Sequence, residues 1–401
     1  MTDTQARDVA SGTEADAGKR LIFDRNLMIC FGVTLMVVMG VTSITPVLPK
    51  VMEVFGISAR QIGLLITSFT IPGVVLTPVM GVLADRFGRK RIIVPSLFLF
   101  GIAGAACCFT RDFHLLLTLR FFQGVGAAAL GPLNITIIGD LFSGQRRTAA
   151  LGLNASILAL AVAAYPVVGG SLAIFGWYVP FFLPILAVPL GCIVLFKLGN
   201  PEPKEQQQIG EYFRAILAGI RNPQVLGLLL ATVATFIILY GPFLTYLPVV
   251  LHRAFGATSF TIGCIISVAS LMTAVVASQL GRLIARFSER RLFKFAFLLY
   301  AVACALMAHM DGLWWFVLPI ALFGLGQGLN LPSVQSLLTS YAPMEQRGAF
   351  MAVNGMALRL GQTLGPLVMG GLYAFFGING VFYGGSVVAV VMFVTAVILV
   401  R

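Results

Sequence analysis

Charge is what this chain most lacks. Only 10% of its 401 residues are charged and 58% are apolar, whereas about 25% of the residues in a soluble domain are charged. This balance excludes a water-soluble globular fold. The 32 Phe and the long aliphatic runs exclude a disordered or collagen-like chain. Acidic residues are the scarcest charged type, 15 in all, and none of them interrupts the long apolar runs.

Cysteine and histidine are also few. The six Cys and three His show no metal-ligand spacing, so we expect neither a metal site nor a disulfide framework. Nothing in the sequence matches a catalytic triad or a nucleotide loop, and we predict no catalytic residues, no cofactor and no enzymatic activity. Basic residues do not alternate with aromatic ones outside the apolar runs, which argues against a nucleic-acid partner.

Long charge-free runs are abundant instead. A helix needs about 20 apolar residues to cross the ~30 Å hydrocarbon layer. Such runs cover 26–49, 61–84, 92–110, 222–252, 254–281, 295–310 and 312–344, and one more, 113–139, contains only Arg120. Residues 148–196 and 348–400 are each long enough for two helices, with turns near Gly176 and Gly377. The sequence therefore predicts an all-α polytopic membrane protein with twelve transmembrane helices.

The basic residues predict its orientation. With a cytosolic N-terminus, 21 of the 27 Lys and Arg fall in cytosolic segments and four fall in external loops. This positive-inside bias predicts a multi-pass plasma membrane protein, in the inner membrane if the cell is Gram-negative, with both termini cytosolic. The net charge of +12 then indicates attraction to anionic membrane lipid.

An internal repeat with an offset of 200 residues organises the chain. Gly124, Pro132 and Asn154 fall on Gly324, Pro332 and Asn354. We expect a cytosolic tail (1–25), two pseudo-symmetric six-helix bundles (26–198 and 223–401), and a cytosolic linker with an amphipathic helix (199–222). Two such halves can rock about a central site, which is alternating access.

Two motifs identify a family. The stretch 81–91, GVLADRFGRKR, resembles the loop signature of the major facilitator superfamily, and 117–126, LTLRFFQGVG, resembles a second signature of that family. The resemblance implies the twelve-span fold of its drug/proton antiporter branch and a cytosolic gate in which Asp85 braces the start of span eleven and Arg89 meets Asp140. The expected gate residues are Gly81, Asp85, Arg86, Gly88, Arg89 and Asp140.

Two arginines are the only charges well inside predicted spans. An Arg near the bilayer centre costs roughly 2.5–3.5 kcal/mol, so Arg120 and Arg359 should face protein or a water-filled cavity. We expect them to contribute to substrate binding or coupling, although Arg120 has the alternative of holding the packing of its span. The other candidate lining residues are Gln123, Asn134, Asn154, Tyr165, Tyr240, Tyr246, Gln327, Asn330 and Gln362.

Spans five and eleven carry Pro and Gly together. Residues 165–170, YPVVGG, resemble the G-P-x-x-G-G signature of the exporter branch, with Tyr165 in place of its first Gly. Pro kinks a helix and Gly allows close approach, as a moving helix requires. The candidate gate-helix residues are Pro166, Gly169, Gly170, Pro366 and Gly370; simple small-residue packing is the alternative.

These features predict a secondary active transporter, a monomer that exports small amphipathic or anionic organic solutes by alternating access, with protons as the coupling partner. Two alternatives remain: an importer or uniporter of an organic anion, and a lipid translocator. The spans lack the carboxylate by which many drug/proton antiporters couple to protons. His114, His252 and His309 lie at external helix ends where they could titrate, but we interpret them as ordinary surface residues.

Overall fold

A computed structural model describes residues 21–199, 222–341 and 347–400 of the chain. Most of the expected cytosolic tail (1–25) and most of the expected linker helix lie outside these residues. The helices of the first half are α2 (Arg25–Thr42), η1 (Thr45–Val47), α3 (Leu48–Phe55), α4 (Ala59–Phe87), α5 (Arg89–Ala106), α6 (Phe113–Leu141), α7 (Gly144–Leu172), α8 (Val179–Phe182), η2 (Leu183–Leu186) and α9 (Ala187–Lys197). Those of the second half are α11 (Pro223–Ile238), η3 (Leu239–Tyr246), α12 (Leu247–Phe255), α13 (Ser259–Arg286), α14 (Glu289–Met307), η4 (Leu313–Phe316), α15 (Val317–Tyr341) and α16 (Arg347–Leu399).

Nine helical stretches within the described residues are long and apolar enough to cross a membrane. This finding confirms an all-α, multi-pass membrane protein. The basic helix α5 and the partly charged α14 are not among the nine, and the last stretch, Phe350–Leu399, contains the backbone reversal at Gly377 (φ 66°, ψ −158°). A left-handed φ is tolerated best by glycine, so the reversal lies where the sequence predicts a turn.

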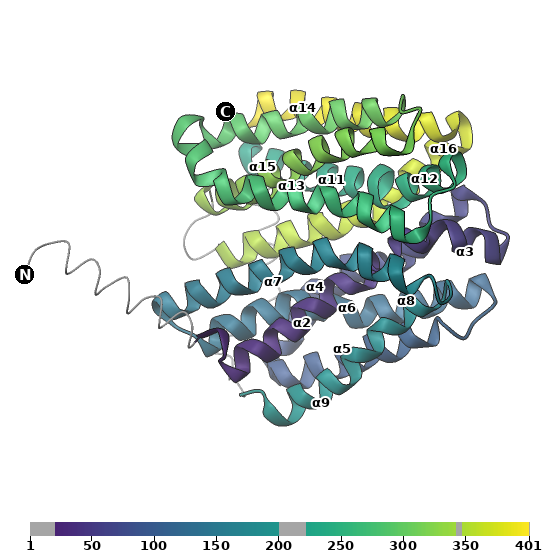
Figure 1. Cartoon of the computed structure of the whole chain (residues 1–401). Helices are drawn as coiled ribbons and strands as arrows, with labels where there is room; N and C mark the ends of the chain where they lie inside the picture. Colours follow the sequence, from purple (N-terminus) through teal and green to yellow (C-terminus); the bar gives the residue numbers. More distant parts are fainter. Residues whose placement is uncertain (1–20, 200–221, 342–346, 401) are drawn as a thin grey trace, which may run out of the picture.

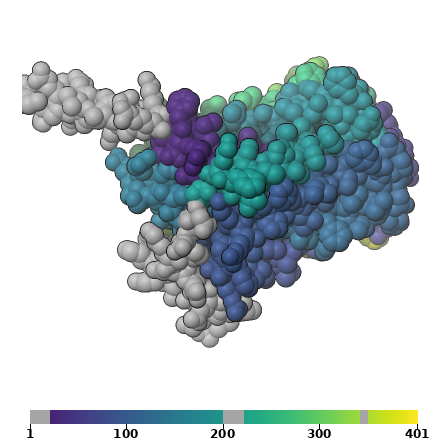
Figure 2. All heavy atoms as spheres, turned by 90° about the horizontal axis from the view of Figure 1, so that it is seen from below, coloured from purple at the N-terminus to yellow at the C-terminus, as the bar shows by residue number. Residues whose placement is uncertain are grey.

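The helices form two groups that lie side by side (Figure 1). Helices α2 to α9 pack together in one group and α11 to α16 in the other, with α7 and α13 in contact between them. The space-filling view from below is covered mainly by the first group (Figure 2). Helix α2 begins and α16 ends at the same end of the molecule, as an even number of crossings requires.

Local geometry repeats with the 200-residue offset. Helices α3 and α12 end at Gly56 (φ 61°) and Gly256 (φ 64°), and the next helices begin at the capping residues Ser58 and Thr258. Such a left-handed glycine closes a helix C-terminus by satisfying its last carbonyls. The repeat seen in the sequence is therefore also a repeat of backbone conformation.

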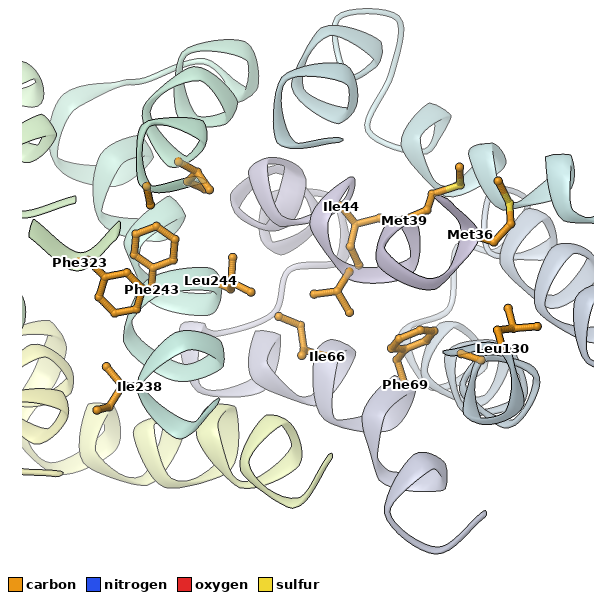
Figure 3. Close-up of a cluster of buried hydrophobic side chains, with 14 of the residues drawn as sticks. Met36, Met39, Ile44, Ile66, Phe69, Leu130, Ile238, Phe243, Leu244 and Phe323 are labelled. Atoms are coloured by element: carbon orange, nitrogen blue, oxygen red, sulfur yellow. The ribbon is translucent and has the colours of Figure 1, made fainter. Parts of the chain in front are cut away.

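The apolar core continues from one group into the other. Phe243 and Phe323 stack within the second group, with ring centroids 4.5 Å apart and an interplanar angle of 3°. Figure 3 shows Leu244 directed toward Ile44 and Ile66 of the first group. All three aliphatic side chains are at most 5% exposed, so the two groups meet through buried apolar surface.

Candidate functional site

The two groups touch mainly toward one end, the end that the basic residues predict to be external. There α7 and α13 are joined by Ser267 Oγ, which donates to the Ala163 carbonyl oxygen at 2.7 Å. Pro166 of α7 lies against Gly263 of α13, and Pro366 of α16 lies against Gly63 of α4. Only small residues allow helix backbones to approach this closely.

The same helix faces separate toward the other end. Most of Gly152–Leu160 in α7 and of Ala274–Arg282 in α13 is exposed. A Cβ atom built on Gly152, Gly281 or Gly355 would find no heavy atom within 4 Å beyond its own helix and neighbours. The structure is thus closed between the halves at the predicted external end and open at the predicted cytosolic end.

One polar cluster lies where the two halves meet between these ends. Arg359 of α16 donates from Nη1 to Gln362 Oε1 at 3.2 Å, and Gln362 Nε2 donates to the Tyr240 hydroxyl at 2.9 Å. The Arg359 side chain also covers Gly73 of α4, where a Cβ would lie 3.0 Å from Arg359 Cδ. Arg359 and Tyr240 are half-buried, and within the described residues no carboxylate pairs with this guanidinium.

A π-helical segment positions the tyrosine of this cluster. Tyr240 lies in η3, and Pro242 within that segment lacks the N–H that a regular helix would use. The neighbouring Gly241 allows η3 to pack closely on α16 at Gly365 and Met369. Short π-helical segments often occur at functional sites because they redirect side chains.

Arg120 lies elsewhere, buried inside the first half. Its side chain is 1% exposed, its Nη1 donates to Gln123 Oε1 at 2.7 Å, and its guanidinium carbon lies 4.4 Å from the centre of the Phe69 ring. Its Nε also donates to the Leu65 carbonyl oxygen at 3.4 Å. Among the described residues, Arg120 and Arg359 therefore share no hydrogen-bond partner, and the placement of Arg120 fits the structural alternative.

Most of the other expected lining residues are buried within their own half. Asn134 Nδ2 and Asn154 Oδ1 both bond to the Thr34 hydroxyl, at 2.7 and 2.6 Å. Gln327 accepts from Tyr300 at 2.7 Å and Asn330 accepts from Thr235 at 3.1 Å. Their exposed fractions are between 1% and 7%, so these side chains are buried in this conformation, and their role in lining a pathway remains a prediction.

The two remaining tyrosines, Tyr246 and Tyr165, differ in how deeply they are buried. Tyr246 is fully buried and stacks on Tyr373 with ring centroids 5.6 Å apart. Tyr165 is half-buried on α7, directly before Pro166. Of the residues expected to line a pathway, Arg359, Gln362 and Tyr240 are therefore the ones that form a cluster between the halves.

The motif between α4 and α5 holds an ion-pair network. Arg89 Nε lies 3.2 Å from Asp140 Oδ2, the contact that the family resemblance implies, and Nη1 of the same Arg89 pairs with Asp85.

The other residues of this motif lie around the turn. Gly88 (φ 102°) makes the turn between the helices, and Arg86 is exposed. Gly81 is half-buried on α4, and the side chains near residue 348 that Asp85 was expected to brace lie outside the described part of the chain. The gating role remains a prediction.

The expected gate-helix residues are all near helix contacts. Gly169 lies against the backbone of Ser43, Gly170 against Ser259, and Gly370 has the Tyr246 hydroxyl 3.2 Å from its built Cβ. Their role in movement remains a prediction.

Sequence reasoning missed two hydrogen bonds in which a side chain of one half meets a side chain of the other. Thr363 of α16 donates its hydroxyl to that of Thr70 in α4 at 3.0 Å, and His252 of α12 bonds to Glu53 of α3 at 2.8 Å. The second of these joins positions next to one another in the repeat, since residue 253 falls on residue 53 under the 200-residue offset. Placing the repeat units face to face across a pseudo-twofold axis would have suggested this contact.

Comparisons with known proteins identify the class. The sequence profile of the Major Facilitator Superfamily matches residues 30–277 and 247–401, so the chain belongs to this superfamily. It is similar to the "Bacillibactin exporter" of Bacillus subtilis (strain 168), with 27% identity over 372 residues, which is 87% of this chain and 90% of the exporter.

A second relative is "Multidrug resistance protein 1" of the same organism, 26% identical over 370 residues, or 90% of this chain and 91% of the relative. Among solved structures, the nucleoside transporter NupG superposes with a TM-score of 0.78 at 13% identity, covering 94% of this chain and 98% of NupG. That likeness supports the fold alone. The chain is thus a multi-pass secondary transporter whose curated relatives include drug-efflux proteins.

Proposed function

We propose that this transporter exports small amphipathic or anionic organic solutes in exchange for protons. It does so as a twelve-span protein whose halves, 26–198 and 223–401, rock about the Arg359 cluster, with both termini in the cytosol. The observation that carries the proposal is the asymmetry of the contacts between the halves, which are closed at one end and open at the other. Reversing that asymmetry would expose the cluster to the opposite side, as alternating access requires.

The cluster itself favours solutes that accept hydrogen bonds. Arg359 offers a guanidinium that no described carboxylate neutralises, and Gln362 and Tyr240 extend it as one hydrogen-bonded row. A guanidinium binds carboxylates and related anions in bidentate geometry. The ring of Tyr240 and the neighbouring ring of Phe236, 6.1 Å away between centroids, supply flat apolar surface for the rest of such a solute.

Features other than the Arg359 cluster support the direction of transport and the coupling ion. The names of the two curated relatives describe an exporter and a drug-resistance protein, which favours export. A proton gradient is the energy source we propose, because entry of one charge releases about 2.3 kcal/mol per 100 mV of membrane potential.

Purified protein in proteoliposomes tests the proposal. An imposed pH gradient should drive transport of an amphipathic dye such as ethidium or of an organic anion such as fluorescein, and collapse of the gradient should stop it. Anion exchange that is indifferent to the gradient would instead support the importer or uniporter of an organic anion. Movement of labelled phospholipid with no movement of soluble solutes would support the lipid translocator.

A further inference from the structure

Equivalent turns of the two repeats meet at the closed end of the molecule. Helix α3 ends at Gly56 and α12 ends at Gly256, both in the left-handed conformation, and the two helices pack against each other beside the interface of the halves. Figure 1 shows α3 and α12 next to one another at the same end. A contact between their side chains therefore joins the two halves at this end.

The contact that the structure places there is a histidine with an acceptor at both ring nitrogens. His252 Nε2 lies 2.8 Å from Glu53 Oε1, and His252 Nδ1 lies 2.9 Å from the carbonyl oxygen of Ala257. A carbonyl oxygen only accepts, so Nδ1 must carry a proton. In neutral imidazole the other nitrogen then presents a lone pair, and a lone pair facing a carboxylate is unfavourable. This hydrogen-bond geometry therefore requires an additional proton between His252 and Glu53.

The neighbouring charges favour an ionised Glu53, because the hydrogen bond from Lys50 lowers the pKa of this carboxyl. Lys50 Nζ lies 2.8 Å from Glu53 Oε2, so a fixed cation already pairs with the other oxygen of the carboxylate. Two other charged groups lie around the turns: Arg253 donates to the Tyr373 hydroxyl at 3.5 Å, and Arg60, the second residue of α4, has its backbone carbonyl oxygen near Gly370. An ionised Glu53 between Lys50 and a doubly protonated His252 satisfies every hydrogen bond of the group.

The turn after α12 fixes the orientation of the His252 ring. Gly256 brings Ala257 back over the last turn of α12, where the Ala257 N–H donates to the Leu251 carbonyl oxygen at 3.1 Å. This return places the Ala257 carbonyl oxygen beside His252 and fixes the orientation of the ring. The equivalent position in α3 is Met52, which cannot titrate.

We propose that His252 and Glu53 form a proton-binding site that links the two halves and closes the predicted external end when His252 is protonated. The ligand is a proton taken from the external side; its release leaves a lone pair against the Glu53 carboxylate and weakens closure. The inference rests on the proposed alternating-access function, since a transporter that did not open at this end would have no use for such a contact.

Distance measurements between the halves test the site. Spin labels on Phe109→Cys, in the turn after α5, and on Trp314→Cys, in η4, would report opening without touching the pair, since both residues are at the predicted external end and are 77% and 69% exposed. The background is Cys192→Ser, which removes an exposed thiol. Histidine gains its charge between about pH 5 and pH 8. On going from pH 5.5 to pH 8.5 we expect the ratio of closed to open molecules to fall about two- to fivefold, the size of a solvent-accessible ion pair.

Three variants define the outcome. His252→Gln should abolish the pH response, and His252→Arg should keep the ratio at its low-pH value at both pH values because its charge is fixed. His309→Gln is the matched control, since His309 bonds to Tyr383 at 2.7 Å within the second half and should leave the response intact. A wild-type ratio that ignores pH, or a His252→Gln variant that responds like the wild type, would overturn the proposal.

Transport by the same proteins separates the two proposals. Gradient-driven dye export by a wild type whose label distances ignore pH would refute the proton site and leave the transport proposal standing. A pH-dependent closure lost in His252→Gln, together with no transport of any tested solute, would support the site and count against the proposed export.

Discussion

Gly63 of α4 packs directly on Pro366 of α16, and the 200-residue offset turns this contact into a second one between Gly263 and Pro166. A Cβ built on Gly63 would lie 3.0 Å from Pro366 Cβ, and one built on Gly263 would overlap the backbone of Pro166. Each half therefore contributes one glycine and one proline to the closed end. This exchange of partners is the geometry expected of two repeats related by a pseudo-twofold axis.

Adding a methyl group at this contact should hold the closed end apart. Gly263→Ala places a Cβ against a backbone that cannot move aside, and overpacking of this kind costs about 1–3 kcal/mol. We expect the Phe109–Trp314 label distances to shift toward the open population. Gly281→Ala on the same helix faces open space and should leave the distances unchanged. If Gly263→Ala and Gly281→Ala shifted the label distances equally, the close approach of Gly263 to Pro166 would not be what holds this end closed.

Arg359 should determine how well anionic solutes are transported. Arg359→Gln removes a charge-assisted hydrogen bond worth about 1.5–3 kcal/mol, which corresponds to a roughly 10- to 100-fold increase in KM for an organic anion. The KM of Arg359→Lys should lie between those of the wild type and Arg359→Gln, because lysine keeps the charge and loses the planar guanidinium group. Arg253→Gln, which removes a cation at the closed end, is the control. Unchanged anion transport in Arg359→Gln would remove this residue from the site.

We expect Arg120 to contribute to the stability of the fold. Gln123→Leu removes the side-chain acceptor of Arg120, a residue that is 1% exposed, and a buried donor left unsatisfied costs about 1–3 kcal/mol or more if charged. Thermal unfolding in detergent should show a lower midpoint. Gln279→Leu removes the same type of partner from Arg282, where the bond of 2.8 Å is exposed, and should change the midpoint little. A stable Gln123→Leu protein with lost transport would instead indicate a direct functional role.

The network around Arg89 should also contribute to stability. Arg89→Ala would leave Asp85 and Asp140 without their shared cation, and breaking a buried ion pair from one side costs up to about 3–5 kcal/mol. We expect the lower end of that range because the Asp140 side chain is 18% exposed. Arg86→Ala, at an exposed position of the same motif, is the control. Chemical denaturation that gives the same midpoint for both variants would show that the network does not stabilise the fold.

The elements that could be predicted are those governed by local sequence. Charge spacing predicted the long apolar helices, and the turns expected near Gly176 and Gly377 fall where the chain has left-handed or reversed backbone, with φ of 150° and 66°. The contact between Arg89 and Asp140 followed from the family resemblance. Each of these depends on a few neighbouring residues or on a motif whose form is the same wherever it occurs.

The lining residues could not be predicted in the same way. Asn134, Asn154 and Gln327 lie on small, polar helix faces, and the sequence alone does not say whether such a face meets its own half or the other one. The structure turns them inward to Thr34 and Tyr300, because a buried amide requires a hydrogen-bond partner and these hydroxyls are within reach.

By itself the sequence determined that this is a duplicated helical membrane protein of the Major Facilitator Superfamily, because hydrophobic length, charge bias and motif are properties of continuous segments. The tertiary structure decided which arginine is packed within one half and which lies between the halves, and it brought Glu53 to His252 across 199 positions of chain. Such pairs depend on how two separate bundles are placed against each other, and that placement is set by the sum of many contacts between them.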